Sequence, residues 1–396
     1  MAQVLVAPDK FKGSLSAQEV ADGVIRGLRA VDGGIDAIAI PVADGGEGTL
    51  AAAMAAGFAR VPVTASGPTG HPVRTAYARR GGMAVVEMAD VSGLGRLPDG
   101  RLEPLRSSSR GTGEVIAAAL DAGCTSIVLG IGGGACTDGG AGLAQALGAR
   151  VLDPHGRRLP PGGAALAGVD RVDLSGMHPR LAEADIVVAC DVDNPLTGPG
   201  GAATVYGPQK GASAADVATL ERAMQQWAAA VAAVSGSDLS DRPGAGAAGG
   251  VGFGCLALLG GSLRSGIDLI LELVGFDERL DGARLVVTGE GSLDTQTLRG
   301  KAPAGVAAAA GAAGVRTVAV CGTSKLSSAD LHGAGIDAAY ALVDIEPDVA
   351  RCMTDAAPLL ERLGQEIARD ELQRRERRGS ELPSLEPLTS RQLRIQ

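Results

Sequence analysis

Two carboxylates and a carboxamide follow a buried apolar stretch near the middle of the sequence. The run 184–190 has the composition of a strand, and Asp191, Asp193 and Asn194 come directly after it, ahead of a glycine-rich turn at 198–201. Oxygen ligands of this kind suit Mg²⁺, and a carboxylate can also accept a proton. Asp191 is therefore a candidate metal ligand or general base, and the sequence alone does not separate these roles.

Two further acidic side chains follow predicted strands. Asp44 comes after the strand 37–42, and Glu290 comes after the strand 284–287. Open α/β sheets bind ligands and metals at the carboxyl ends of their strands, so both side chains are candidate metal or water-orienting groups. Asp44 can equally be only the cap of the helix that follows it.

Lysine is rare in this chain, and its positions are informative. Four of the five lysines lie in loops or glycine-rich motifs, and Lys10 and Lys12 stand just before a predicted helix whose Ser16 and Glu19 fit a capping box. A compact positive charge at such a place suits a phosphate group. The alternative is an ordinary solvated loop.

A glycine loop joins a predicted strand to a predicted helix within 126–148. The strand runs into Gly132, Gly133 and Gly134, and Asp138 is a candidate N-cap. Backbone N–H groups of such a loop can bind phosphate oxygens, and the helix dipole favours negative charge. Comparable loops recur at 44–49, 198–202, 244–254 and 289–300, and this recurrence favours phosphate chemistry.

Two familiar nucleotide motifs are absent from the sequence. Residues 244–249 match GxGxxG, but no strand precedes them, so the dinucleotide-binding fingerprint lacks its structural context. No GxxxxGK[ST] occurs either, which excludes a P-loop kinase. At the start of the helix near residue 110, Ser108, Ser109 and Arg110 suit a carboxylate or phosphate, although plain capping explains the serines equally well.

Composition excludes several classes of protein. The 396 residues are 45% apolar and only 2% aromatic, with a net charge of −9, which argues against nucleic-acid or anionic-membrane binding. The six cysteines are far apart and form no CxxC pair, so a zinc site or disulfide framework is not expected. No signal peptide or 18-residue apolar window is found, and we expect a cytoplasmic protein.

The pattern of elements predicts an α/β protein with two domains. Strand and helix patterns alternate at both ends of the chain, which favours one parallel sheet built from the N-terminal and C-terminal parts. The segment 61–88 instead resembles hairpins, so we place a domain boundary near residue 66. The segment 107–150 fits either domain. The charged, proline-containing segment 369–396 is predicted to be a frayed helix end and a disordered tail.

Eight motifs occur in an order that resembles one enzyme family. They are APDKFKGSLSA (7–17), PVADGGEGT (41–49), SSRGTGE (108–114), GIGGGACTDGGAG (130–142), CDVDNPLTG (190–198), YGPQKGA (206–212), GAGAAGG (244–250) and TGEGSLDTQT (288–297). Together they resemble the bacterial class I glycerate kinases. The resemblance implies a Rossmann-like parallel-sheet domain at 1–66 and 280–368, an inserted mixed β/α domain at 67–279, and an active site in the cleft between them.

The resemblance also implies an activity. Members of the family transfer the γ-phosphoryl group of ATP to D-glycerate with Mg²⁺, usually giving 2-phosphoglycerate, and we expect the same here. On this reading the catalytic candidates are Asp191, Lys10, Lys12 and Asp44, and the metal candidates are Asp191, Asp44 and Glu290. The substrate candidates are Ser108, Ser109, Arg110 and Asn194; the nucleotide candidates are Gly132, Gly133, Gly134, Asp138, Gly246, Gly249, Gly250 and Glu290.

Other interpretations stay open at this point. A kinase of this family could instead phosphorylate the 3-hydroxyl or a related hydroxy acid. A dinucleotide oxidoreductase or a sugar-acid-binding regulator without catalysis would also use glycine loops. D-Glycerate is the expected small-molecule partner, no nucleic acid or membrane partner is expected, and a homodimer stays open.

Overall fold

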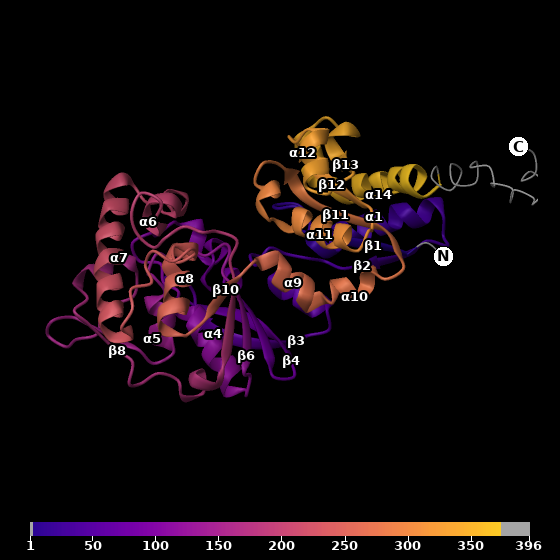
Figure 1. The fold of residues 1–396 in the computed structure, drawn as a ribbon. Helices are drawn as coiled ribbons and strands as arrows, with labels where there is room; N and C mark the ends of the chain where they lie inside the picture. Colours follow the sequence, from indigo (N-terminus) through magenta and orange to yellow (C-terminus); the bar gives the residue numbers. More distant parts are fainter. Residues whose placement is uncertain (1–2, 374–396) are drawn as a thin grey trace, which may run out of the picture.

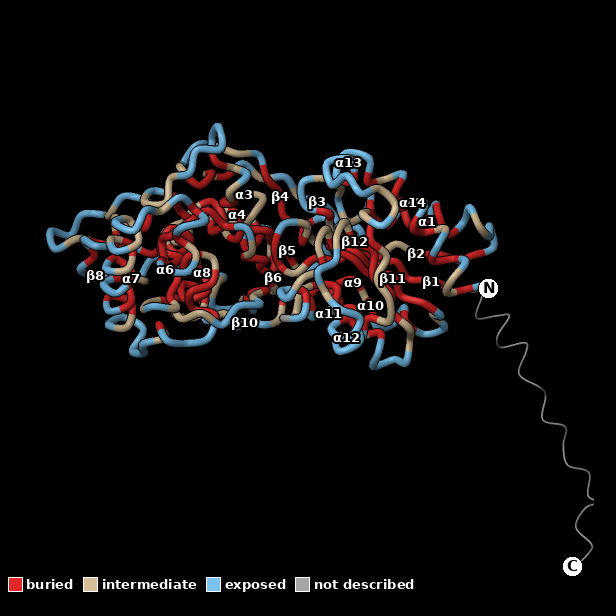
Figure 2. Tube along the Cα trace, turned by 90° about the horizontal axis from the view of Figure 1, so that it is seen from above, coloured by how far each residue is buried: buried red, intermediate tan, exposed pale blue. Residues whose placement is uncertain are grey.

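The computed structural model describes residues 3–373, with the side chain of Arg299 left out. It has two lobes, each built on its own β-sheet, with helix α9 (Gly266–Val274) between them (Figure 1). The central strands of both sheets are largely buried (Figure 2). In the described part of the chain, no helix combines the length and apolar character needed to cross a membrane.

The first lobe contains a five-stranded parallel sheet in the order β13-β12-β11-β1-β2. Its strands are β1 (Gln3–Pro8), β2 (Asp36–Ala39), β11 (Ala283–Leu293), β12 (Thr317–Ser324) and β13 (Ala338–Ala341). Because β1 pairs with β11 on one side and with β2 on the other, the two ends of the chain share this sheet, as the alternating pattern predicted.

Helices cover both faces of the first sheet. Val4 and Val6 face a cluster that includes residues of helices α1 and α14, whereas Leu5 and Ala7 face residues of α9, α10 and α11. These helices are α1 (Ala17–Val31), α10 (Phe276–Leu280), α11 (Ala302–Ala312) and α14 (Ala356–Ile367), and short helices α12 (Ser328–Gly333) and α13 (Val349–Thr354) complete the lobe. The predicted capping box of Ser16 and Glu19 begins α1.

The second lobe contains a six-stranded mixed sheet in the order β10-β9-β6-β5-β4-β3. Its strands are β3 (Ala59–Ser66), β4 (Pro72–Arg80), β5 (Met83–Glu87), β6 (Ser126–Gly130), β9 (Asp185–Ala189) and β10 (Ser262–Arg264). Strands β3, β4 and β5 are antiparallel neighbours, which confirms the predicted hairpins, and the strands from β5 to β10 are parallel.

The large core of the second lobe lies on one face of its sheet. Ile127 and Leu129 of β6 pack there with the helices, and the fully buried Trp227 belongs to the same cluster, as predicted for a core residue. The helices are α3 (Ala89–Ser92), α4 (Arg110–Asp121), α5 (Ala141–Ala146), α6 (Ala202–Tyr206), α7 (Ala214–Ser235) and α8 (Ala247–Leu258). A small two-stranded antiparallel sheet of β7 (Arg150–Leu152) and β8 (Arg171–Asp173) completes the lobe.

Two helices connect the lobes through apolar contacts. Helix α2 (Thr49–Ala55) carries Leu50 and Ala53 into a cluster with Ala78 and Val85 of the second sheet. Leu273 of α9 joins the same cluster, while other residues of α9 pack on the first sheet. Since both helices touch both lobes, they hold the two sheets in a defined arrangement.

Strand pairing bears on the predicted domain limits. Strand β3 lies within residues 59–66, which the sequence placed in the first domain, yet it pairs only with β4 of the second sheet. Helix α9 lies in the segment 67–279 but packs largely on the first sheet. We therefore propose domain limits near residues 58 and 265. Strand β6 assigns the segment 107–150, which fitted either domain, to the second sheet.

The predicted tail overlaps the described chain by five residues. A π-helical turn, Ala368–Gln373, follows α14, and Leu372 within it is buried. Glu371 accepts hydrogen bonds from Arg316, which fixes this turn against the first lobe. The remainder of the predicted disordered tail, 374–396, lies outside the described residues.

Candidate active site

A cleft of about 570 Å³ lies at the carboxyl ends of the first sheet's strands. The loops after β1, β2 and β11 form most of its polar wall, and Gly132 and Gly133 from the loop after β6 line the opposite side. The cleft therefore lies between the two lobes. Ligand sites of open parallel sheets are found at this edge, because the loops that follow the strands converge there.

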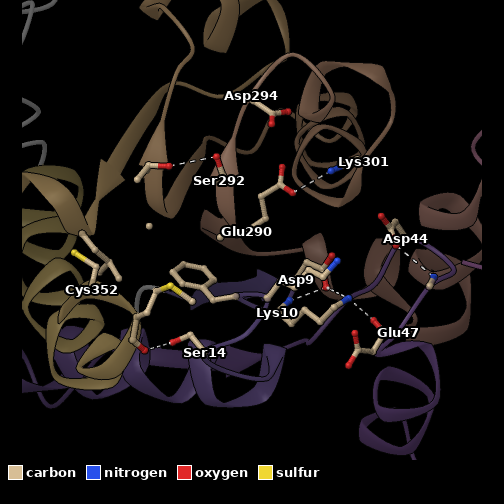
Figure 3. A pocket seen from close by; sticks show the side chains of 18 of the residues that line it. Asp9, Lys10, Ser14, Asp44, Glu47, Glu290, Ser292, Asp294, Lys301 and Cys352 are labelled. Carbon is tan, nitrogen blue, oxygen red and sulfur yellow. Dashed lines mark hydrogen bonds and ion pairs between the residues drawn. The ribbon is translucent and has the colours of Figure 1, made fainter. Parts of the chain in front are cut away.

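Asp9 stands at the centre of the charged part of this cleft (Figure 3). It follows β1 directly and is only 8% exposed. Burial raises its pKa to about 7, nearby Asp44 and Glu290 act in the same direction, and Lys10 opposes them. The Lys10 amide donates to Asp9 Oδ1 at 2.6 Å. A carboxyl group with such a pKa can exchange a proton near neutral pH.

Lysine side chains supply positive charge along the same wall. Lys10 Nζ lies 3.8 Å from Asp9 Oδ1 and donates to the carbonyl oxygen of Glu47. Lys12 and Lys301 also line the cleft, and Lys301 is the N-cap residue of α11. Three ammonium groups around one cavity suit an anionic ligand.

Glu290 is oriented by its neighbours on the loop after β11. Thr297 Oγ1 donates to its Oε1 at 2.6 Å, and Lys301 Nζ lies 3.9 Å from its Oε2. Burial raises the pKa of Glu290, while the Thr297 hydrogen bond and Lys301 oppose that effect. The sequence placed Glu290 after a strand ending at residue 287, but β11 continues to Leu293, so Glu290 lies within this strand, opposite Cys321 of β12.

Asp44 and Asp191 approach each other from different lobes. Asp44 lines the cleft and accepts a 3.3 Å hydrogen bond from the Gly46 amide, and helix α2 has Gly48 rather than Asp44 as its N-cap. Asp191 follows β9 and accepts from the Gly266 amide at 2.8 Å. Burial raises the pKa of Asp191 to about 6, and Asp44 contributes in the same direction. Asp191 itself is not among the residues that line the cleft.

The glycine loop after β6 brings the lobes together. The Gly132 amide donates to the Gly45 carbonyl at 3.1 Å, so it is not free for a phosphate. A Cβ at Gly132 would lie 2.6 Å from the Gly46 Cα atom. Glycine is therefore needed here for close approach of two backbones, whereas the sequence predicted an anion cradle. Gly134 lies deeper, and a Cβ there would meet the Met88 side chain at 2.7 Å.

Three other predicted residues form a buried cluster away from the cleft lining, and a fourth, Arg110, pairs elsewhere. Asp138 Oδ2 accepts from Ser108 Oγ and the Ser109 amide, both at 2.8 Å, and from the Gly142 amide at 3.2 Å. Arg110 forms an ion pair with Glu114 on the next turn of α4. The structure thus brings Ser108, Ser109 and Asp138 together, with the serine hydroxyl groups directed to this carboxylate.

The glycines of 244–250 also serve packing. The Gly246 amide donates to the Asn194 carbonyl at 2.8 Å, and a Cβ at Gly249 would lie 2.1 Å from the Cys136 carbonyl oxygen. Gly250 has a φ of +88° and would meet Leu196 at 2.6 Å. The Asn194 side chain donates to Gly200 and accepts from Tyr206. These predicted nucleotide and substrate residues are enclosed within the second lobe.

Several cleft residues were missed as candidates in the sequence. Asp9 sits between the first strand and two lysines, Asp294 belongs to the same motif as Glu290, and Lys301 follows that motif by four residues. The position of Asp9 directly after a predicted parallel strand could have marked it as a candidate site residue. Ser292, which accepts a hydrogen bond from Thr323 at 3.2 Å, and the wall formed by α13 carried no such signal.

The donor set of the cleft consists of carboxylate oxygens. Within residues 3–373, no group of three or more His, Cys, Asp or Glu side chains is close enough to hold a metal ion without other ligands. Mg²⁺ is usually bound through one or two carboxylates, together with water and substrate phosphates. The pair Asp44 and Asp191, with Glu290 nearby in the cleft, fits that mode of binding.

The fold and the cleft define an α/β protein with two lobes and a lysine-lined cleft between them. The glycerate kinase family model matches residues 4–371. A glycerate kinase of Bacillus subtilis (strain 168) is 44% identical over 369 residues, covering 92% of this chain and 97% of that protein. The glycerate 2-kinase of Escherichia coli (strain K12) is 41% identical over 344 residues, covering 86% and 90% respectively.

A solved structure agrees with these sequence relatives. A crystal structure from Salmonella typhimurium LT2, provisionally assigned as glycerate kinase 2, superposes with a TM-score of 0.82 at 38% identity and covers 96% of this chain and all of that one. The chain belongs to the glycerate kinase family and is a kinase. The predicted family and the two-part α/β fold are thereby confirmed.

Proposed function

We propose that this enzyme transfers the γ-phosphoryl group of ATP to D-glycerate and forms 2-phospho-D-glycerate. The observation that carries the proposal is the cleft in which three lysines surround Asp9, Asp44 and Glu290 at the carboxyl edge of a parallel sheet. Phosphoryl transfer requires charge neutralisation and an oriented hydroxyl group, and this set of side chains supplies both. The E. coli relative named as a glycerate 2-kinase supports the 2-position.

Asp9 is the group we assign to the transferred proton. The substrate hydroxyl oxygen attacks the γ-phosphorus, the bond from phosphorus to the β-phosphate oxygen breaks, and ADP leaves with that oxygen. The hydroxyl proton passes to a carboxylate. Asp9 lines the cleft and has a pKa of about 7, which suits a base that works near neutral pH. Asp191, the candidate from sequence, has a pKa of about 6 but lies outside the cleft lining.

Lys10, Lys12 and Lys301 are assigned to the phosphates and to the acid group of glycerate. Each lines the cleft, and Lys10 lies beside Asp9. The sequence assigned the substrate carboxylate to Ser108, Ser109 and Arg110. Their bonds to Asp138 and Glu114 occupy these groups, so the cleft lysines have the better support.

Asp44 and Asp191 are the residues we assign to Mg²⁺, with Glu290 as a further ligand or water-orienting group. Their hard oxygen atoms suit this ion. Burial is the main cause of the raised pKa of Asp191, and a cation would relieve the repulsion by Asp44 that adds to it. Bound Mg²⁺ would neutralise phosphate charge. A cytoplasmic location and a homodimer stay predictions.

Phosphorus NMR of the product tests the proposal. Purified protein is incubated with D-glycerate, ATP and Mg²⁺, and the products are compared with authentic 2- and 3-phosphoglycerate. The 2-phosphoglycerate signal is the expected result. A 3-phosphoglycerate signal would support glycerate kinase activity but show that the 3-hydroxyl oxygen, not the 2-hydroxyl oxygen, accepts the phosphoryl group. Folded protein that forms neither product would contradict the proposal.

A further inference from the structure

Two large apolar side chains are exposed on one wall of the cleft. Val349 is 53% exposed and Met353 is 48% exposed, and both line the cavity. They are four residues apart on α13, so they lie on the same face of that helix. Single exposed apolar residues are common, but a pair beside a charged cavity offers a surface that an apolar ligand can cover.

The helix that carries this pair is held in place by both of its ends. Asp348 caps its start by accepting from the Ala350 amide at 2.9 Å. Near its end, Ser14 Oγ donates to the Met353 carbonyl at 2.6 Å and ties the helix to the turn after β1. The buried Cys352 donates to the Glu346 carbonyl at 3.0 Å. The apolar surface is therefore formed before any ligand arrives.

The two ends of the cleft differ in chemistry. Figure 3 shows Cys352 on one side, Asp44 and Lys301 on the other, and Asp9 between them. The apolar end also includes Leu342, and the Ser292–Thr323 hydroxyl pair lies along the same cavity. One cavity thus offers apolar contact, then hydroxyl groups, then positive and negative charges.

We infer that the surface of Val349 and Met353 binds the adenine base of the nucleotide, with the phosphates directed to the lysines. This assignment rests on the proposed use of ATP. The parts of a nucleotide follow the same order as the surfaces of the cleft. A nucleotide has a flat base with apolar faces, then a ribose with hydroxyl groups, and then a charged phosphate chain. The volume of about 570 Å³ is within the range of roughly 300–1,000 Å³ that holds small-molecule ligands.

The assignment differs from the one based on glycine loops. Around Gly249 and Gly250, an added Cβ would meet other atoms at 2.1 and 2.6 Å, so that region has no space for a base. Gly132 and Gly133 lie across the cleft, beside the charged end. They lie near the charged groups rather than near the apolar surface, and the base is assigned to α13.

Isothermal titration with Mg-ADP tests the assignment in the full-length chain. Val349→Asn and Met353→Gln keep the size of each side chain but weaken its apolar contact. We expect each to raise the Kd for Mg-ADP about fivefold to tenfold, consistent with the loss of part of an apolar side-chain burial. Since both positions are half exposed, the variants should fold.

Matched controls come from other exposed apolar residues. Val234→Asn on α7 and Met54→Gln on α2 change side chains that are each 40% exposed and lie outside the cleft lining. Their Kd for Mg-ADP should change less than twofold. Magnesium tripolyphosphate, which has no base, should bind the wild type and the two α13 variants with equal affinity.

The outcomes separate this inference from the proposed function. If the wild type phosphorylates glycerate with ATP and the α13 variants have the same Kd for Mg-ADP as their controls, the base site is rejected while the proposed function stands. Variant-sensitive ADP binding without glycerate phosphorylation supports the base site while the proposed function fails. A wild type that does not bind ADP overturns the base site. Equal weakening of ADP and glycerate binding also overturns it, and would instead indicate that the second lobe closes onto α13.

Discussion

The loops after β1 and β6 occupy equivalent places in their sheets but have different surroundings. Each places an aspartate and glycine residues beyond a buried parallel strand. Asp9, after β1, faces a cavity together with Lys10. Asp138, after β6, accepts hydrogen bonds from Ser108, Ser109 and Gly142 within the second lobe. An aspartate beyond a strand is thus available to a ligand only where other elements leave space opposite it and protein donors do not already occupy it.

Charged lysines show the same contrast. Lys10 stands at the cleft, where a ligand can pair with it. Lys210 is buried, donates to the Cys136 carbonyl at 2.6 Å, and has its pKa lowered by burial. Protein groups already surround the second lysine, so it contributes to the packing of the lobe and leaves anion binding to the first.

Asp9→Asn should give the largest effect on turnover. Loss of the proton acceptor is expected to lower kcat by about 10²–10⁴-fold. The wild-type kcat/KM should rise with pH up to about 7, because the raised pKa keeps Asp9 protonated below that value, and the variant should lose this acid limb. Steady-state kinetics from pH 5.5 to 9 provide the measurement.

Asp294→Asn is the matched control for that experiment. Asp294 lines the same cleft, but its Oδ1 accepts from the Gln296 amide at 2.8 Å and orders a turn. A decrease of less than tenfold is expected. If the two variants were equally impaired, the special role of Asp9 would be rejected.

Asp191→Asn should act mainly through Mg²⁺. With one carboxylate removed from the pair with Asp44, the Mg²⁺ concentration for half-maximal activity should increase about 10- to 100-fold. Titration of activity with Mg²⁺ measures this change, and high Mg²⁺ should restore most of kcat. A kcat that stays 10²-fold low at saturating Mg²⁺ would return the proton-acceptor role to Asp191.

Asp138→Ala should affect folding far more than chemistry. The variant leaves the Ser108, Ser109 and Gly142 donors without their acceptor, so the free energy of unfolding should decrease by about 3–5 kcal/mol. Urea unfolding measures it, with Asp238→Ala as control, because exposed Asp238 accepts only the 2.9 Å bond from Ser240. A stable variant with a strongly raised KM for ATP would show that Asp138 belongs to the nucleotide site.

Gly132→Ala should give the smallest of these effects. The new Cβ would approach the Gly46 Cα atom at 2.6 Å and displace the loop that carries Asp44. We expect a decrease of about 1–3 kcal/mol in the free energy of unfolding and about tenfold in kcat/KM. Gly95→Ala, where a Cβ meets nothing within 4 Å, should leave both quantities unchanged. If the two variants had the same stability and kcat/KM, the claim that a glycine at position 132 is needed for close approach of the lobes would be rejected.

Much of the fold could be predicted because its signals are local. The apolar runs of β1, β6 and β9 and the capping box at Ser16 depend on neighbouring residues only. The place of β3 could not be predicted, because its partner β4 decides which sheet it joins. Pairing between strands is a tertiary property, and it overrides the position of a strand in the chain.

The candidate site was predicted in part for the same reason. Asp44 follows β2, and Glu290 lies near the carboxyl end of β11, so the order of elements placed both at one edge of the sheet. The roles of Gly249 and Ser108 could not be predicted from the sequence, because glycine and serine serve packing and hydrogen bonding as readily as ligand binding. The wall formed by Met353 depends on a helix far from the other motifs in sequence.

The most direct test of the central claim is a crystal structure with D-glycerate, Mn²⁺ and a non-hydrolysable ATP analogue. Anomalous scattering would locate the metal ion without ambiguity. We expect Mn²⁺ beside Asp44, with the terminal phosphate near Lys10 at the edge of the first sheet. A metal ion and phosphates bound beside Asp138 and Gly249 in the second lobe would contradict this claim.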